Sequence, residues 1–179
     1  IDKSNSKNIV FIVICTPIEE VGRDHDFDWA IIEPSSVRSI IQLSGRVLRH
    51  RTKTINQPNI SIMQYNIKGL EKRKNDILGI SYARPGYETN NFKLNTHDIN
   101  KLLINCNFEN MISSIPRIVK NNELIYDKRL DDLEHKVLNS KLANFEGKGA
   151  KFLYGWISQS WFFTAIAQRA IKFRENNND

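Results

Sequence analysis

The chain has 179 residues, of which 40% are hydrophobic and 26% are charged, and its formal net charge is +6. This composition can build a hydrophobic core and predicts a soluble protein. The chain has only two cysteines, Cys15 and Cys106, and this number argues against a disulfide framework or a metal knuckle. The positive charge favours an anionic partner such as nucleic acid, although proteins of many functions share this charge balance.

The most apolar stretch, residues 152–167, argues against a membrane protein. It is shorter than the about 20 apolar residues that span a bilayer. It is also interrupted by the small or polar residues Gly155, Ser158, Gln159, Ser160 and Thr164. The first residues show no signal-peptide pattern. We therefore expect a cytoplasmic protein without a membrane segment.

Three short apolar runs in the first third of the chain predict β-strands. Residues 9–15 are continuously apolar and mostly β-branched, which is typical of a strand buried on both faces in a parallel sheet. Cys15 at its end is expected to be a small buried side chain. Residues 29–32 and 59–65 predict two further strands.

A helix is predicted between the second and third strands, from about residue 37 to residue 49. Pro34 breaks the chain after the second strand, and Ser35 or Ser36 is the expected N-cap. The order strand, loop, strand, helix, strand indicates an α/β fold with a parallel sheet, whose ligand edge lies at the carboxyl ends of the strands. Three strands are too few for a complete sheet of this kind, so we expect the chain to be part of a longer protein.

The rest of the chain is expected to be mostly helical. Residues 69–84 are charged, with EKRK at their centre, and predict a solvated linker or, alternatively, a patch that contacts phosphate groups. Helical spacing follows in residues 97–107, with Thr96 as a candidate N-cap, and in residues 130–144. A final helix is predicted over residues 151–173.

This final helix is rich in aromatic residues, including Phe152, Trp156, Trp161 and Phe163. Packing in a hydrophobic core is the simpler interpretation of these side chains. The alternative is a platform on which nucleic-acid bases stack. The basic side chains that would accompany such a platform are Lys148, Lys151, Arg169 and Lys172.

The first motif segment, residues 16–28, reads TPIEEVGRDHDFD and directly follows the first predicted strand. A loop in this position can present backbone N–H groups and polar side chains to an anion or a sugar. Gly22 permits a close approach or a positive φ. Asp24 could accept hydrogen bonds from a ribose hydroxyl or orient an arginine, and Thr16 could contact a nucleic-acid phosphate. The alternative is an acidic surface loop that caps a helix.

The second motif segment, residues 42–51, reads QLSGRVLRHR. In the predicted helix, Arg46 and Arg49 lie about one turn apart, so their guanidinium groups project from the same face. Two planar cations on one face suit the γ-phosphate of a nucleotide, whose charge spreads in the transition state of phosphoryl transfer.

Together the two motif segments, T-x-x-x-E-x-G-x-D followed by Q-x-x-G-R-x-x-R, resemble motifs V and VI of superfamily 2 helicases, in the second RecA-like domain. Residues 20–46, EVGRDHDFDWAIIEPSSVRSIIQLSGR, are similar to the CRISPR-associated helicase–nuclease of type I systems, closest to the type I-F (Ypest) branch. The close resemblance covers about residues 9–65.

The resemblance implies that residues 1–68 are the C-terminal portion of a second RecA-like helicase domain. Residues 69–92 would then be a linker, and residues 93–179 a mostly α-helical accessory domain. It further implies a parent protein recruited to a crRNA-guided surveillance complex (Cascade/Csy), where an HD-type nuclease cuts DNA and the RecA-like domains reel in single-stranded DNA using ATP. CRISPR adaptation proteins and phage inhibitors are further partners that it suggests.

Position by position, the resemblance also implies a role for each motif residue. The expected catalytic arginine fingers, which reach ATP bound on the other RecA-like domain, are Arg46 and Arg49. The residues expected at the nucleotide are Gly22, Asp24, Gln42 and Gly45, the last of which lets the helix pack closely. The residues expected nearer the DNA are Thr16 and Glu20.

The half of a helicase site that binds Mg²⁺–ATP is not recognisable in this sequence. It contains no G-x-x-x-x-G-K-[ST] loop and no D-E-x-[HD] motif, so this chain alone should not hydrolyse ATP. ATP, Mg²⁺ and the divalent metal of the nuclease are therefore expected to bind mainly outside it. His97 and Asp98 form an HD dipeptide, but no further histidines are spaced to complete a metal site with them. The dipeptide is therefore predicted to start a helix. Residues 24–28 are predicted to form a loop at the nucleotide cleft rather than a metal site.

Two other functions stay open. The first is a different superfamily 2 protein, such as an RNA helicase or a restriction-type translocase, which the presence or absence of an HD nuclease module would decide. The second is a non-enzymatic docking module whose arginines bind an acidic partner. A docking module should be indifferent to ATP, so nucleotide dependence distinguishes it.

Overall fold

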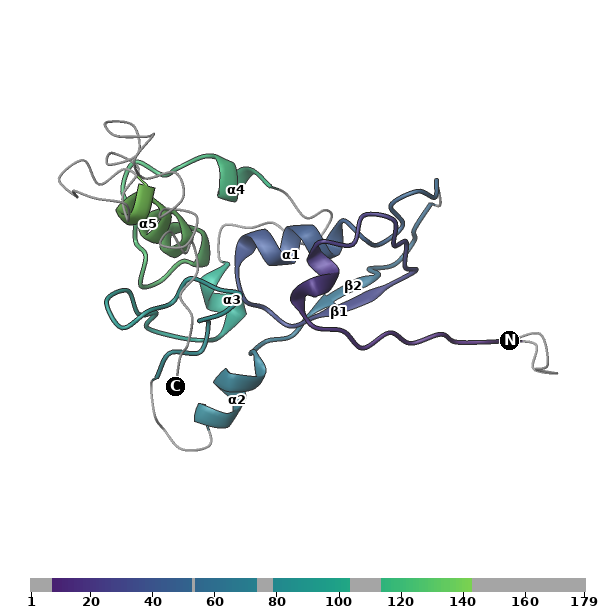
Figure 1. The fold of residues 1–179 in the computed structure, drawn as a ribbon, viewed down its shortest axis with the longest axis horizontal. Helices are drawn as coiled ribbons and strands as arrows, with labels where there is room; N and C mark the ends of the chain where they lie inside the picture. Colours follow the sequence, from purple (N-terminus) through teal and green to yellow (C-terminus); the bar gives the residue numbers. More distant parts are fainter. Residues whose placement is uncertain (1–7, 53, 74–78, 104–113, 143–179) are drawn as a thin grey trace, which may run out of the picture.

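A computed structural model describes residues 8–52, 54–73, 79–103 and 114–142. Its elements, in chain order, are η1 (Pro17–Glu20), β1 (Ala30–Ile32), α1 (Val37–Ser44), β2 (Ile60–Ile62), α2 (Ile67–Arg73), α3 (Ile99–Leu102), α4 (Ile115–Ile118) and α5 (Leu130–Leu142). β1 and β2 are parallel neighbours, with Ala30 opposite Ile60, and α1 lies between them in the chain (Figure 1). The described part of the chain therefore has an α/β fold.

The start of α1 agrees with the sequence prediction. Ser36 is extended (φ −156°, ψ 160°), and its Oγ accepts a hydrogen bond of 3.1 Å from the backbone N–H of Ser39. This hydrogen bond confirms Ser36 as the N-cap. Val37 and Ile40 on the inner face of the helix are buried, because this face packs into the core.

The end of α1 differs from the prediction, because the helix stops at Ser44 instead of continuing to residue 49. After Gly45 the chain turns, and Val47 forms a parallel bridge with Phe27. Leu48 then has a positive φ of 48°. The pairing with the first motif segment thus ends the helix, so the prediction that Arg46 and Arg49 project from one helical face is wrong.

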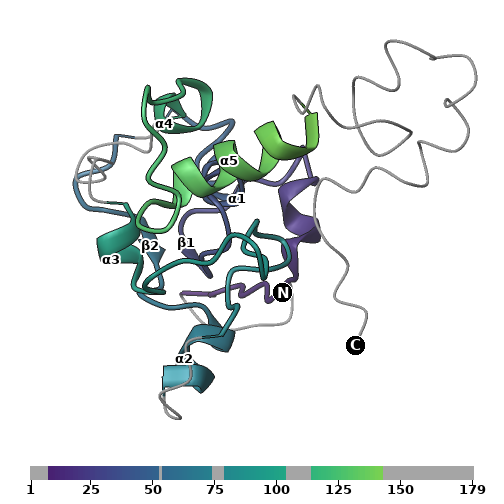
Figure 2. The same ribbon diagram turned by 90° about the vertical axis from the view of Figure 1, so that its left-hand side faces the viewer.

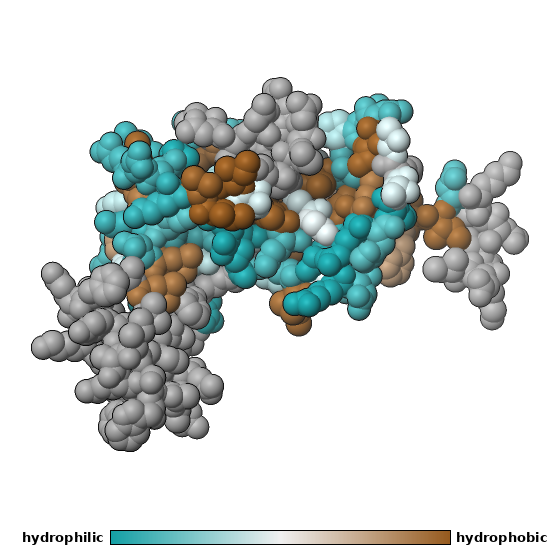
Figure 3. Space-filling model, turned by 90° about the horizontal axis from the view of Figure 1, so that it is seen from above, coloured by the Kyte–Doolittle hydropathy of each residue, from teal (hydrophilic) through white to brown (hydrophobic). Residues whose placement is uncertain are grey.

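The predicted strand at residues 9–15 is also wrong in this structure. The segment lies outside the two-stranded sheet, and its apolar side chains are exposed, with Ile14 at 95%. Cys15 is exposed rather than buried. The segment extends away from the body of the molecule in Figure 1, and brown hydrophobic atoms are visible at this end of the molecule in Figure 3. A strand buried on both faces needs neighbours on each side, and the described residues supply none.

One hydrophobic core joins segments that the resemblance assigned to different domains. Its residues are Ile32, Val37, Ile40, Tyr82, Tyr87, Leu94, Ile99, Leu102, Leu103, Leu130, Leu133 and Val137. α5 contacts α1, whereas α2 extends at the lower edge of both ribbon views (Figure 1, Figure 2). The division into domains stays a prediction. Tyr82 and Tyr87, which lie in the predicted linker, pack into the same core as α1 and α5.

Two of the predicted later helices are present. The helix predicted over residues 97–107 is α3 in the described part, and the one predicted over residues 130–144 is α5. Asp98 caps α3 by accepting a hydrogen bond of 3.0 Å from the backbone N–H of Asn100, which confirms the helix-start role of this dipeptide but replaces Thr96 as the N-cap. The aromatic helix predicted over residues 151–173 lies outside the described residues.

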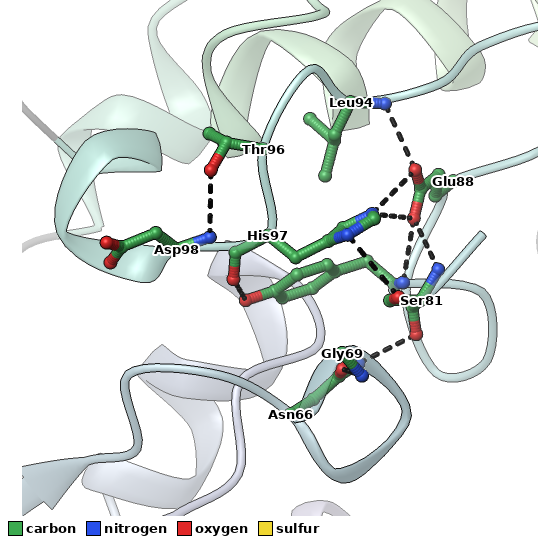
Figure 4. A network of polar contacts seen from close by, with 9 residues as sticks. Asn66, Gly69, Ser81, Glu88, Leu94, Thr96, His97 and Asp98 are labelled. Carbon is green, nitrogen blue, oxygen red and sulfur yellow. Dashed lines mark hydrogen bonds and ion pairs between the residues drawn. The ribbon is translucent and has the colours of Figure 1, made fainter. Parts of the chain in front are cut away.

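A buried polar network centred on Glu88 holds the middle of the chain together (Figure 4). The Glu88 carboxylate accepts hydrogen bonds from the backbone N–H groups of Ser81, Tyr82 and Leu94 at 2.7, 2.9 and 3.1 Å. His97 Nε2 lies 3.1 Å from both carboxylate oxygens. Glu88 is only 3% exposed, and these partners offset the cost of removing its charge from water.

This network predicts a specific loss of stability in acid. Burial acts to raise the pKa of Glu88, but the hydrogen bonds from His97 and from the three backbone N–H groups outweigh it and hold that pKa below its usual range. A carboxylate with a lowered pKa in the folded state stabilises the fold above its unfolded pKa of about 4.3, and this stabilisation is lost as the pH falls through the folded pKa.

The test compares the free energy of unfolding of the unchanged chain with that of Glu88→Gln, measured by urea titration. We expect their difference to shrink between about pH 6 and about pH 3, because acid neutralises the unchanged carboxylate. Comparing the two proteins cancels the opposite contribution of Asp131 and Glu134, whose pKa values are raised by burial. A difference that stays constant with pH would contradict this account.

Candidate functional site

The two motif segments predicted to act together lie side by side. The backbone N–H of Phe27 donates to Arg46 O at 2.9 Å, and the backbone N–H of Leu48 donates to Phe27 O, also at 2.9 Å. Because these bonds run directly between the segments, the loop before β1 and the turn after α1 form one structural unit. The candidate functional site is this unit, residues 16–28 with residues 42–51.

Asp26 holds the end of the second motif segment. Its carboxylate accepts hydrogen bonds from the backbone N–H groups of Arg49 and His50 at 3.0 and 3.3 Å. It also accepts two hydrogen bonds from the Arg51 guanidinium, at 3.0 and 3.1 Å. The hydrogen bond from Arg51 is the main reason that the pKa of Asp26 lies below its usual range. Asp28 binds the same guanidinium at 2.6 Å.

The two predicted arginine fingers are held in different ways. Arg46 is half-buried, and its Nη2 donates to the backbone oxygen of Glu20 in η1 at 2.8 Å. Arg49 is exposed, and the hydrogen bond to Asp26 is made by its backbone N–H, so its guanidinium extends from a fixed backbone. The structure thus brings both residues into one unit but gives Arg46 the more constrained side chain.

Glu20 connects η1 to α1. Its carboxylate is buried and binds Arg38 Nη2 at 3.0 Å. The backbone N–H of Arg38 in turn lies 3.4 Å from the carboxylate of Glu134 in α5. Burial is the main cause of the raised pKa of Glu134. The predicted DNA contact of Glu20 stays a prediction, although the ion pair with Arg38 directs its carboxylate into the protein.

Two predicted nucleotide residues come from the end of α1. Gln42 is half-buried, and within the described residues its buried Oε1 has no hydrogen-bond partner. Gly45 is the C-cap, and a Cβ added to it would lie 3.4 and 3.5 Å from the carbonyl oxygens of Ile41 and Gln42. These are atoms of its own helix, so the predicted close packing at Gly45 involves no neighbouring element of the described structure.

The remaining predicted residues lie on the first motif segment. Thr16 is the exposed residue before η1, and Asp24 is exposed on the loop that follows. The ring of His25 pairs with the Glu19 carboxylate and lies only 2.8 Å from where a Cβ on Gly22 would be. The close neighbour of Gly22 is therefore the His25 ring, and the close approach of a ligand at Gly22 stays a prediction.

Sequence reasoning missed Asp26 and Arg51. The aspartates of residues 24–28 suggested an arginine-orienting role for Asp24, whereas the structure gives that role to Asp26 and Asp28. Only the turn after Ser44 brings the two backbone N–H groups and the Arg51 side chain to Asp26. In the described residues there is no group of three or more His, Cys, Asp or Glu side chains that could hold a metal ion.

Comparison with known proteins identifies the class of protein to which these motif segments belong. A family described as "CRISPR-associated nuclease/helicase Cas3, C-terminal" matches residues 1–52, which contain both segments. The chain is 36% identical over 187 residues to a protein of Pectobacterium atrosepticum, covering 100% of this chain and 16% of that protein. It is 43% identical over 137 residues to a protein of Pseudomonas aeruginosa, covering 76% of this chain and 12% of that protein.

Both relatives are named "CRISPR-associated nuclease/helicase Cas3 subtype I-F/YPEST". The chain therefore belongs to the Cas3 family of CRISPR-associated nuclease/helicases and corresponds to its C-terminal region, with subtype I-F/YPEST proteins as relatives. It spans 16% and 12% of the lengths of the two curated relatives. No helix within the described residues has the length and apolar character needed to cross a membrane.

Proposed function

We propose that the chain is the C-terminal part of an ATP-dependent single-stranded DNA helicase or translocase that carries an HD-type nuclease and degrades foreign DNA in CRISPR interference. The observation that carries this proposal is the backbone pairing of the two motif segments through Phe27 and Val47, within the residues that match the family. In this proposal residues 1–68 complete a RecA-like domain, and the rest forms a linker and an accessory domain.

The residues present fit one side of an ATP site. The exposed Arg49 guanidinium suits a phosphate, and two buried polar atoms, Gln42 Oε1 and Arg46 Nε, have no hydrogen-bond partner among the described residues. Such atoms need a partner, and a nucleotide could supply one. The described residues lack an acidic cluster for Mg²⁺, so we place Mg²⁺ and the nuclease metal in other parts of the longer enzyme.

The chemical role of this chain is electrostatic. A planar guanidinium offers five N–H donors and stays protonated at all relevant pH values, so it can bind phosphate oxygens while their charge spreads in the transition state. Arg49 would contact the nucleotide directly. Arg46 would reach it through Nε while its Nη2 stays bound to the Glu20 carbonyl oxygen.

The partners in this proposal are single-stranded DNA and a crRNA-guided surveillance complex of the Cascade/Csy type, acting in the cytoplasm. CRISPR adaptation proteins and phage inhibitors are further candidate partners. The family membership and the net charge of +6 support a nucleic-acid partner. Gly22 and Asp24 would lie at the nucleotide, and Thr16 would lie nearer the DNA.

The proposal can be tested by following the loss of a labelled target DNA in a reconstituted reaction. The reaction contains the full-length enzyme, its surveillance complex and divalent metal. We expect processive degradation with ATP, and at most limited cutting when ATP is replaced by a non-hydrolysable analogue. A docking module should give the same result with both nucleotides, so an unchanged result would contradict the proposal.

A further inference from the structure

The turn that carries Arg49 has an unfavourable backbone that needs support. Leu48 has a φ of 48°, in the left-handed region that is unfavourable for a residue with a side chain. Such a conformation persists only where its surroundings hold it in place. In this structure the next two backbone N–H groups, those of Arg49 and His50, both point at the carboxylate of Asp26.

This arrangement resembles the concave backbone sites that bind anions, in which successive N–H groups around a left-handed residue converge on one acceptor. Here the anion is a side chain of the same protein. Arg51 closes the site from the other side, with its Nε and Nη2 on the two oxygens of Asp26. The carboxylate is thus held by backbone and side-chain donors together, which directs it inward to the turn rather than to a ligand.

Asp28 provides an internal comparison. It binds the Nη1 of the same Arg51 guanidinium at 2.6 Å, and its backbone oxygen accepts from the Asn59 side chain. The hydrogen bonds of its carboxylate reach Arg51 and not the backbone of residues 49–50. The two aspartates therefore share a partner but differ in the one contact that fixes the position of Arg49.

We infer that Asp26 is a positioning residue for Arg49, because it holds the backbone from which that arginine side chain extends toward the nucleotide. This inference rests on the function proposed above. A misplacement of about 1 Å can lower a catalytic rate about a hundredfold, so losing the backbone hydrogen bonds should affect turnover strongly even though Asp26 does not touch the nucleotide.

The test measures kcat and KM for DNA-stimulated ATP hydrolysis by the full-length enzyme and its variants. We expect Asp26→Asn to lower kcat by about a hundredfold with little change in the KM for ATP. The matched comparison is Asp28→Asn, which also removes one carboxylate from Arg51 but leaves the backbone hydrogen bonds of Arg49 and His50 in place, so it should lower kcat much less than Asp26→Asn does. A kcat for Asp26→Asn close to that of the unchanged enzyme, or an equal loss in both variants, would overturn the inference.

A double variant separates positioning from a general loss of stability. If Asp26 acts through Arg49, then adding Asp26→Asn to Arg49→Ala should lower kcat no further, because residues that act together are not additive. If Asp26 only stabilises the fold, the two losses should multiply, which would reject the inference. Absence of DNA-stimulated hydrolysis in the unchanged enzyme would instead reject the proposed function.

Discussion

Replacing Arg49 by alanine in the full-length enzyme is expected to lower kcat for ATP hydrolysis about a thousandfold or more, the usual loss when an arginine finger is removed. The fold should be unaffected, because Arg49 is exposed and its hydrogen bond to Asp26 is made by the backbone. The measurement is DNA-stimulated ATP hydrolysis, with the thermal unfolding temperature recorded for each variant.

The control for this variant is Arg84→Ala, which removes an exposed arginine outside both motif segments and should leave turnover unchanged. Arg46→Ala should also abolish turnover, but with some loss of stability, since it leaves the Glu20 carbonyl oxygen without its 2.8 Å hydrogen bond. Near-normal hydrolysis by either Arg49→Ala or Arg46→Ala would remove that residue from the proposed nucleotide site.

Replacing Gly86 by alanine is expected to have the largest effect on stability. A Cβ at this position would lie 2.1 Å from the carbonyl oxygen of Tyr82 and 2.4 Å from that of Ser35. Both are backbone atoms, so neither can turn away as a flexible side chain could. We expect a loss of about 3 kcal/mol, because overpacking here must move the backbone just before α1.

The matched control for Gly86→Ala is Gly45→Ala. Gly45 has an ordinary φ of −69°, and its added Cβ would meet its nearest atoms at 3.4 and 3.5 Å. Thermal unfolding of the two purified variants should show a loss of several degrees for Gly86→Ala and a much smaller shift for Gly45→Ala. Equal unfolding temperatures would mean that the contact between Gly86 and Ser35 does not constrain the fold.

Local signals in the sequence predicted the start of α1 correctly. Ser36 caps α1 as expected, because an N-cap depends on residues close together in the chain. The end of α1 was missed for the opposite reason. The end depends on the pairing of Val47 with Phe27. These two residues lie far apart in the chain, so no local pattern in the sequence indicates their contact.

Residues 9–15 show what local patterns leave undecided. Their apolar, β-branched character is typical of a buried strand, but a strand also requires neighbours in a sheet, and none of the described residues provides them. The burial of Tyr82 and Tyr87 was not predicted either, because the charged residues at positions 71–74 suggested that this part of the sequence is solvated.

The candidate site was predicted in its parts but not in its geometry. The sequence indicated that the two motif segments act together, and the structure places them in contact. The roles expected for the single motif residues stay predictions. The contacts of Asp26 depend on the turn at Leu48, which directs two backbone N–H groups toward its carboxylate. The division between a constrained Arg46 and an exposed Arg49 has the same origin.

The most direct test of the account is the rate of ATP hydrolysis by the full-length enzyme with and without single-stranded DNA. We expect a clear stimulation by the DNA, because the two motif segments would belong to a motor that couples the nucleotide to the strand. An ATP hydrolysis rate that single-stranded DNA leaves unchanged would contradict it, and would favour a module whose arginines bind an acidic partner.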